Sequence, residues 1–568
     1  MTKNIKRMGK VTLAAITLGL LVFLLAPTLS FASTQNYLFL FNTCLDTETN
    51  LGVTASLEFA VADNDDDDAN LDADADGTTN HVILDAESTS DTVDAAALND
   101  VPYVVSNGHI TFNYSYIRQR AREKLASTDA ELLGEQEPTN HYVPGDTKTI
   151  AIEGIDEKSV TYLELMCVRA DESSNCTIWC ESETTCPYTD EQFESIEAVF
   201  DSNYEKFLDI IGEYKDIRDG QAGNDVKGDA DGDGKLAIVF HAAGEDIAGY
   251  FDPSDIMLGG ENHFDCIHIS TEGYPNGPTL DMYSTLFHEL QHLYEAVLTD
   301  DQNELPLFLN EAFSVSVEHA IFGSDVEGLL DFVDSLNTEF TSERSLTVFV
   351  NEMYSYGSSY AFGQYLRTRY AAQTDATLQE DEDLPAGYQV YGHILQNYYG
   401  EYEGKWENIA PKLFGENAQE FVQDFWKAVY LKEDSGKYGF NGEEWAEKLA
   451  PITTSIDELD SLPIISNGSV CVLTSSNPIR YCVLESDEDF AVSGYGDVEA
   501  YEPDPTPTPT PSPDPDPSPT AQPTSSGDSA NRLAATGDSN LALGLLVLAS
   551  VGTCTCAFAY RLSRKNRE

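Results

Sequence analysis

Basic side chains are scarce in this sequence of 568 residues, which has 31 Lys and Arg against 98 Asp and Glu and a formal net charge of −67. This shortage argues against a nucleic-acid-binding protein, because the phosphates would be repelled. An acidic surface instead suits a soluble extracellular protein, bound cations or basic substrates. Apolar residues make up 41% of the chain, enough for two or three packed domains.

Proline and glycine are absent from residues 281–300, so the sequence predicts an uninterrupted helix there. This stretch contains the motif HELQH, which runs from His288 to His292. Residues four apart lie on one face of a helix, so the two histidines can bind one metal ion with Glu289 beside it. That geometry is typical of a zinc peptidase. The alternative is a buried helix whose histidines pair with neighbouring side chains.

A third ligand is predicted on the next helix. Asn310 and Glu311 lie near its start, and Glu311 comes 19 residues after His292. This order resembles the gluzincin peptidases, in which the Glu of an Asn-Glu pair completes a two-His, one-Glu zinc site and leaves the fourth position to water. A metzincin is excluded, because Glu295 and Leu298 stand where that family needs Gly and His.

These ligands predict a mechanism. Three protein ligands and one open position let zinc lower the pKa of a bound water and polarise the scissile carbonyl. Glu289 is predicted to take the proton of that water and to deliver it to the departing amine. The oxyanion needs another hydrogen-bond donor, and we predict that Tyr354 or Tyr356 provides it. The alternative is that both rings pack in the core or line the substrate cleft.

The order of the segments widens the resemblance. The segments before the motif are predicted strands after His141, a helix at 189–214, an acidic turn at 225–234 and a strand at 236–241. Over about 141–448 the chain resembles the secreted hyicolysin-like neutral metallopeptidases. The resemblance implies an α+β, zincin-like module of two lobes, a mixed sheet plus the active-site helix and then a helical lobe. Val315 stands four residues after Glu311, where thermolysin-like enzymes place an Asp that orients a His ligand, so another side chain is expected to do this.

The acidic turn alternates carboxylates at Asp229, Asp231 and Asp233, and Asp225 precedes them. This is the spacing of the first half of a calcium loop, although Phe240 stands at the twelfth position in place of a bidentate Glu. We predict a candidate calcium site from these four residues. The alternative is an ordinary Asp-Gly turn between a helix and a strand.

Eight of the ten cysteines precede the C-terminal tail, an even number that predicts disulfides in an oxidising compartment. We predict one bridge, Cys471 with Cys482, across a hairpin. The cysteines from Cys167 to Cys186 lack paired Cys-x-x-Cys spacing, which argues against a structural zinc site among them.

Both ends of the chain predict a place on the cell surface. Residues 1–32 have the basic start, apolar run and small-residue end of a secretory signal. The pentapeptide LAATG at 533–537, the uncharged run 541–560 and a basic tail resemble a Gram-positive sortase signal. The resemblance implies cleavage between Thr536 and Gly537 and attachment to peptidoglycan. The alternative is a plain C-terminal membrane anchor.

The predicted segments, in order, are a signal peptide at 1–32, an N-terminal β-rich region at 33–140, a β-rich upper catalytic lobe at 141–300, a helical lobe at 301–450, a small β segment at 451–500, a Pro/Thr/Ser-rich linker that spans the wall at 501–532 and the sorting signal at 533–568. We expect a monomeric, wall-anchored zinc endopeptidase whose partners are protein substrates, sortase and peptidoglycan. The alternatives are a surface adhesin on a peptidase fold and a calcium-stabilised structural protein.

Overall fold

The structure is a computed structural model. It describes residues 35–47, 50–61, 80–85, 103–106, 108–112, 141–153, 160–181, 187–213, 229–244, 247–257, 262–298, 305–349, 353–373 and 386–501. The predicted signal peptide, Asp225, the linker and the sorting signal with Thr536 and Gly537 lie outside these residues. Among the helices within them, none has the length and apolarity needed to cross a membrane; the predicted span at 541–560 is not among them.

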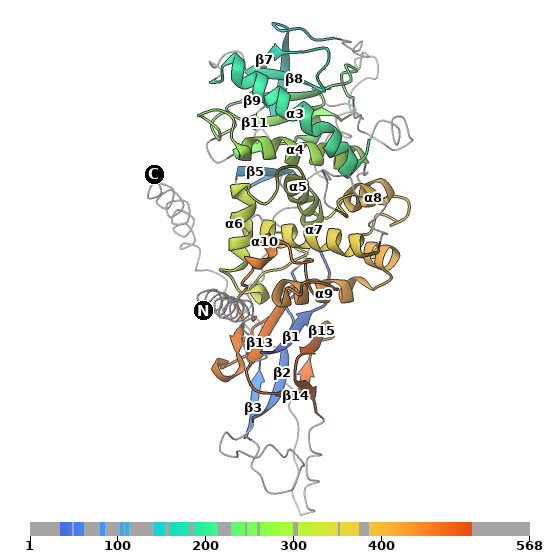
Figure 1. Cartoon of the computed structure of the whole chain (residues 1–568). Helices are drawn as coiled ribbons and strands as arrows, with labels where there is room; N and C mark the ends of the chain where they lie inside the picture. Colours follow the sequence, from blue (N-terminus) through green and yellow to red (C-terminus); the bar gives the residue numbers. More distant parts are fainter. Residues whose placement is uncertain are drawn as a thin grey trace, which may run out of the picture. The chain divides into compact units, whose positions relative to one another are not determined.

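A mixed sheet of eight strands forms the part of the fold that precedes the HELQH helix (Figure 1). Its strands, in spatial order, are β4 (Tyr103–Ser106), β5 (Gly108–Phe112), β10 (Ile247–Tyr250), β11 (Cys266–Ser270), β9 (Leu236–His241), β8 (Cys176–Glu181), β7 (Val160–Arg169) and β6 (Thr147–Glu153). The central strands β8, β9 and β11 are parallel, whereas β10 pairs with β11 antiparallel. The predicted mixed sheet, and with it the α+β class, is confirmed.

Both faces of this sheet are covered, which explains the continuous apolar run of β9. Ile238 and Phe240 pack in the main core with the helices. Ala237 and Val239 pack on the opposite face, in a smaller cluster that includes Trp179. Successive residues of a strand point to opposite faces, so a strand that is buried on both sides is apolar throughout.

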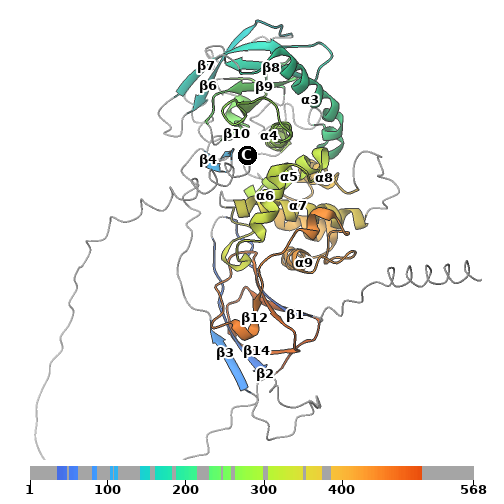
Figure 2. The same cartoon turned by 60° about the vertical axis from the view of Figure 1, so that its left-hand side comes forward.

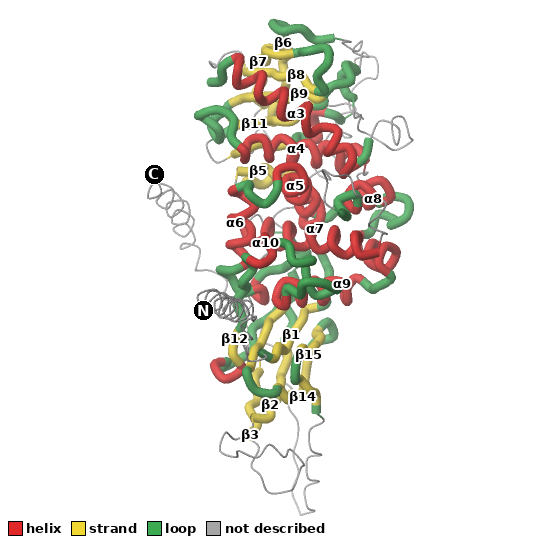
Figure 3. The backbone as a smooth tube through the Cα atoms, in the orientation of Figure 1, coloured by secondary structure: helices red, strands yellow, loops and turns green. Residues whose placement is uncertain are grey.

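The described residues also contain a group of α-helices (Figures 2 and 3). They are α3 (Asp190–Ile211), α4 (Leu280–Leu298), α5 (Leu307–Phe322), α6 (Glu327–Leu336), α7 (Met353–Gln373), α8 (Val390–Asn397), α9 (Ala418–Leu431) and the short α10 (Glu444–Glu447). Helix α4 contacts β10 and β11 on one side and α5 on the other, and α5 in turn contacts α7. The HELQH helix therefore lies between the sheet and the helical part.

The N-terminal and C-terminal β segments, predicted as separate regions, share two four-stranded sheets. One sheet has the order β12 (Thr454–Ser455), β13 (Val470–Ser475), β1 (Asn36–Asn42) and β15 (Phe490–Tyr495), and the other has β16 (Val498–Ala500), β14 (Ile479–Ser486), β2 (Ala55–Val61) and β3 (Asn80–Asp85). Leu38 and Leu40 of β1 pack against Leu57 and Phe59 of β2. Later strands β4 and β5 of the N-terminal region join the eight-stranded sheet instead.

The predicted Cys471–Cys482 disulfide is wrong, because both residues carry thiols. Cys471 lies on β13 and Cys482 on β14, and these strands belong to different sheets rather than to one hairpin. The thiol of Cys482 is 3.7 Å from the carbonyl oxygen of Val483. Among the described residues only Cys180 is disulfide-bonded. The expectation that disulfides are the rule in this chain is corrected accordingly.

Candidate metal centre

The HELQH motif lies in the middle of α4, a helix buried over almost its whole length. The rings of His288 and His292 are four residues apart and their centroids are separated by 4.8 Å. Leu286, Leu290 and the other apolar residues of α4 pack in the main core. This packing holds the helix in place, so the positions of the two imidazoles follow from its regular geometry.

Glu311 approaches both histidines from α5, which begins directly after Pro306. One carboxylate oxygen of Glu311 lies 3.4 Å from His288 Nε2, and the other lies 3.8 Å from His292 Nε2. The three side chains can place one ligand atom each within 4.8 Å of one another. The structure thus brings together the three residues predicted as zinc ligands. Two imidazole nitrogens and a carboxylate are the donor set of catalytic zinc sites, so these residues fit that ion.

The other ring nitrogen of each histidine is held by α5. His288 Nδ1 donates to Glu318 Oε1 at 2.7 Å, and Glu318 also accepts a hydrogen bond from Ser284. His292 Nδ1 lies 3.2 Å from Asn310 Oδ1. These contacts leave both Nε2 atoms directed at Glu311, which is how outer partners orient the ligands of a metal.

Glu318 therefore takes the orienting role that Val315 cannot fill. It lies seven residues after Glu311, two turns along α5, and so on the same face of that helix. The sequence alone predicts such a residue but does not identify it. The signal was the carboxylate at this helical spacing, and only the pairing of α4 with α5 decides that it meets His288.

The charges of the centre are strongly coupled. Burial by itself lowers the pKa of His288, but hydrogen bonds to Glu311 and Glu318 outweigh it and raise this pKa well above its usual value. Burial lowers the pKa of His292, and the negative charge of Glu311 opposes this shift. The surroundings of His288 and His292 are thus rich in negative charge, and a bound cation would be stabilised by the same carboxylates that attract these protons.

Glu289, the predicted base, is buried at 1% exposure beside the ligands. Its charge raises the pKa of both His288 and His292. It also raises the pKa of Tyr274, although burial contributes more to that shift. The Tyr274 hydroxyl is 2.8 Å from Thr285 Oγ1, one helical turn before Glu289. Tyr274 is a half-buried phenol near the base, and the sequence analysis did not identify it.

The predicted oxyanion donors Tyr354 and Tyr356 lie in α7 and are buried. The Tyr356 ring stacks on Phe332 and meets Phe349 edge-on, with centroids 5.3 Å and 5.2 Å apart. Burial, and then the charges of Tyr430 and Glu339, raise the pKa of Tyr354 well above its usual value. These surroundings are those of core aromatics.

The acidic turn is ordered by its own backbone. Asp229, Asp231 and Asp233 accept hydrogen bonds from the backbone amides of Gly234, Asp233 and Lys235. Asp265, which immediately precedes β11, joins this turn through the Ala230 amide at 3.1 Å.

Asp229, Asp231 and Asp265 can place carboxylate oxygens within 4.8 Å of one another. Burial, and then the charges of Asp231 and Asp229, raise the pKa of Asp265 well above its usual value. Asp265 is thus a further candidate ligand that sequence spacing could not reveal, because it lies more than thirty residues from the turn. Asp225 lies outside the described residues.

Comparison with known proteins shows a similarity to a metalloprotease. The chain is 27% identical, over 319 residues, to the neutral metalloprotease ShpI of Staphylococcus hyicus. The match covers 51% of this chain and 64% of that protein, which is less than two thirds of its length. No protein-family model matches the chain. This similarity supports a metal-dependent peptidase.

Proposed function

We propose that the chain is a zinc endopeptidase of gluzincin architecture with two lobes, which hydrolyses peptide bonds of extracellular proteins. The observation that carries the proposal is the convergence of His288, His292 and Glu311, with the outer nitrogens of both rings held by residues of α5. A helix that was only structural would have no need to direct two imidazoles and a carboxylate at one point.

Zinc, when bound by these three residues, supplies a Lewis acid that polarises the scissile carbonyl and makes water acidic. Glu289 takes a proton from the attacking water and then gives it to the leaving amine, which leaves as a neutral group. Burial beside the ligands keeps the Glu289 carboxylate near the reacting atoms. The oxyanion accepts a hydrogen bond from a phenol, and we assign this role to Tyr274 beside Glu289, whereas the predicted donors Tyr354 and Tyr356 pack in the core.

The test is cleavage of a mixed peptide library by the purified chain, read by mass spectrometry, with zinc measured in the same samples. We expect Glu289→Gln to retain zinc and to lower kcat roughly 10²- to 10⁴-fold. Glu295→Gln is a matched control, because Glu295 is another buried carboxylate of α4 and accepts from the Leu305 amide. If both wild type and Glu289→Gln hold zinc and neither cuts, a binding module on a peptidase fold is favoured instead.

We also propose a calcium ion at the acidic turn, bound by Asp229, Asp231 and Asp265 with Asp233 and Asp225 as further candidates. Hard cations favour several carboxylate oxygens on one turn, and the buried Asp265 adds one from outside it. The ion would join this turn to the start of β11. Calcium titration of the chelator-treated chain, followed by calorimetry, tests this.

For the cellular location we keep the prediction made from the sequence, which is the cell wall. We propose export by the signal at 1–32 and covalent attachment of Thr536 to peptidoglycan by a sortase, after cleavage before Gly537. Fractionation of a Gram-positive host that expresses the chain tests this. Thr536→Ala should move the protein from the wall fraction to the membrane or the medium; a chain that stays in the wall would contradict the proposal.

A further inference from the structure

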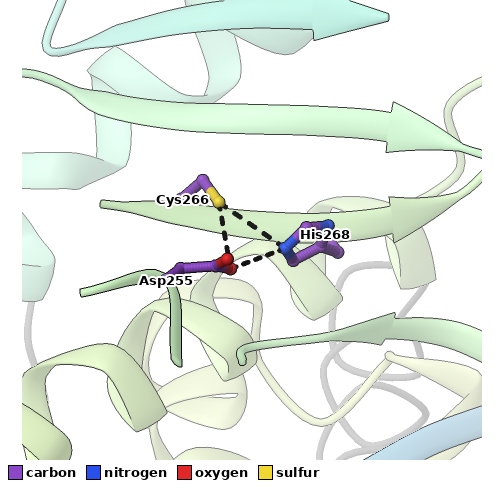
Figure 4. Close-up of side chains that lie close together, drawn as sticks. All are labelled: Asp255, Cys266 and His268. Atoms are coloured by element: carbon purple, nitrogen blue, oxygen red, sulfur yellow. Dashed lines mark hydrogen bonds and ion pairs between the residues drawn. The ribbon is translucent and has the colours of Figure 1, made fainter. Parts of the chain in front are cut away.

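A second group of potential metal ligands lies on the eight-stranded sheet, on the face opposite α4. Cys266 and His268 are alternate residues of β11, so their side chains point to the same face. Ile267 and Ile269 point the other way, into the core that contains α4. Asp255 ends the short helix η2 (Pro253–Asp255), and its carboxylate lies against both side chains (Figure 4).

Three different ligand atoms converge in this cluster. His268 Nε2 lies 2.8 Å from Asp255 Oδ2, and Cys266 Sγ lies 3.2 Å from the same oxygen and 3.5 Å from Nε2. Around a tetrahedral zinc ion, sulfur would lie about 3.5 Å from its nitrogen and oxygen neighbours, and nitrogen about 3.3 Å from oxygen. Both sulfur distances are close to these values. The nitrogen–oxygen pair would have to open by about 0.5 Å.

Outer contacts orient two of the three ligands, Asp255 and His268. Asn262 donates to Asp255 Oδ1 and is itself held by the amide and carbonyl of Ala151, at 2.7 Å and 2.9 Å. This leaves Oδ2 for the cluster. The His268 ring stacks on Tyr250 with centroids 4.3 Å apart and an interplanar angle of 4°. A carboxylate and an imidazole that are fixed in this way are prepared to coordinate an ion.

The charges of the cluster also favour a cation. Asp255, Cys266 and His268 are each at most 1% exposed, and the carboxylate of Asp255 faces the imidazole of His268. A divalent ion would balance one thiolate and one carboxylate in these buried surroundings.

A nucleophilic cysteine site does not fit the geometry. Such a site places the thiol and the carboxylate on different nitrogens of the imidazole. Here Cys266 and Asp255 both contact Nε2 of His268, and its Nδ1 has no hydrogen-bond partner among the described residues. Nδ1 can therefore carry the ring proton when Nε2 binds a cation. The complete burial of the cluster also excludes a peptide substrate.

We propose that Asp255, Cys266 and His268 bind a second transition-metal ion, zinc by their ligand chemistry, which fastens η2 to β11. Sulfur, imidazole and carboxylate together suit zinc better than calcium or magnesium. Binding forms one bond to each of the three ligand atoms. The Cys266 S–H bond breaks and its proton leaves to solvent, while the ring proton of His268 moves from Nε2 to Nδ1. The ion has a structural role, because the burial of its three ligands keeps a substrate from reaching it.

Cobalt replacement tests this proposal in the full-length chain. Metals are stripped with a chelator and Co²⁺ is added, because cobalt bound to a thiolate gives a charge-transfer band in the near ultraviolet. The centre of His288, His292 and Glu311 has no sulfur and contributes no such band. We expect the band in the wild-type chain. Because this spectrum is recorded on the wild type, the test of the second metal site does not depend on whether a variant folds. A cobalt-loaded wild type without the band would overturn the proposal.

Variants with zinc counted separate this ion from the catalytic one. We expect two zinc ions per wild-type chain, one in Cys266→Ser and one in His292→Ala, with the cobalt band lost only in Cys266→Ser. Cys167→Ser is the matched control, a buried thiol on the same sheet face, and should keep both. A single zinc that only His292→Ala removes would overturn this proposal. A single zinc that only Cys266→Ser removes would sustain it and would count against the proposed catalytic centre.

Discussion

Removal of the Glu318 carboxylate is the sharpest test of how the metal centre is built. Glu318 accepts from His288 Nδ1 at 2.7 Å and is almost fully buried. A hydrogen bond to a charged group contributes about 1.5–3 kcal/mol, and each 1.4 kcal/mol is about tenfold in a dissociation constant. We therefore expect Glu318→Ala to weaken zinc binding roughly 10- to 100-fold, the range found for outer partners of metal ligands.

Glu318→Gln should have the smaller effect, because the amide oxygen can still accept from His288 while the charge is lost. The assay is chelator competition for the zinc dissociation constant, beside kcat/KM with zinc in excess. We expect activity to recover substantially at high zinc, since no group that touches the substrate has been removed. Zinc affinity unchanged in Glu318→Ala, or lowered equally in Glu295→Gln, would refute the reasoning.

Three further changes test other parts of the site. Asn310→Ala should weaken zinc binding about tenfold through His292, and retained affinity by the same chelator assay would contradict that role. If the Tyr274 phenol stabilises the oxyanion, Tyr274→Phe should lower kcat by roughly 10²-fold. Tyr356→Phe should chiefly change the melting temperature, because its ring packs on Phe332. The reverse result would assign the oxyanion donor to Tyr356 of α7 instead. Burial, and then the charge of Asp231, raise the pKa of Asp233 from 3.8 to about 7. Between these pH values the calcium-free folded chain holds a proton on Asp233 that the unfolded chain has released. The folded state without calcium therefore loses stability as the pH rises from about 4 to about 7. Calcium should therefore raise Tm more at about pH 8 than at about pH 5, and an equal rise at both would exclude this cluster as the site.

Local backbone geometry explains which features could be predicted from the sequence. The spacing of His288 and His292 determines their common helix face wherever the helix packs, with Glu289 beside them. Glu311 followed because the next helix begins only a few residues after α4 ends. The strand Leu236–His241 was also predictable, because an unbroken apolar run indicates a strand buried on both faces.

Long-range pairing of strands explains which contacts could not be predicted from the sequence. The Cys471–Cys482 bridge was wrong because two strands close in sequence entered different sheets, one beside β1 and the other beside β2. No spacing rule links Asp265 to the acidic turn, which precedes it by more than thirty residues, because their approach depends on the parallel pairing of β9 with β11.

The sequence by itself identified the candidate metal ligands, since ligand type and helical period are local properties. Tertiary structure alone decided which side chains support those ligands and which buried groups meet elsewhere. Glu318 reaches His288 because α4 packs on α5, and Asp255 reaches Cys266 and His268 because η2 lies over β11. Such contacts join residues that are not related by a helical or strand spacing, so only the tertiary packing brings them together.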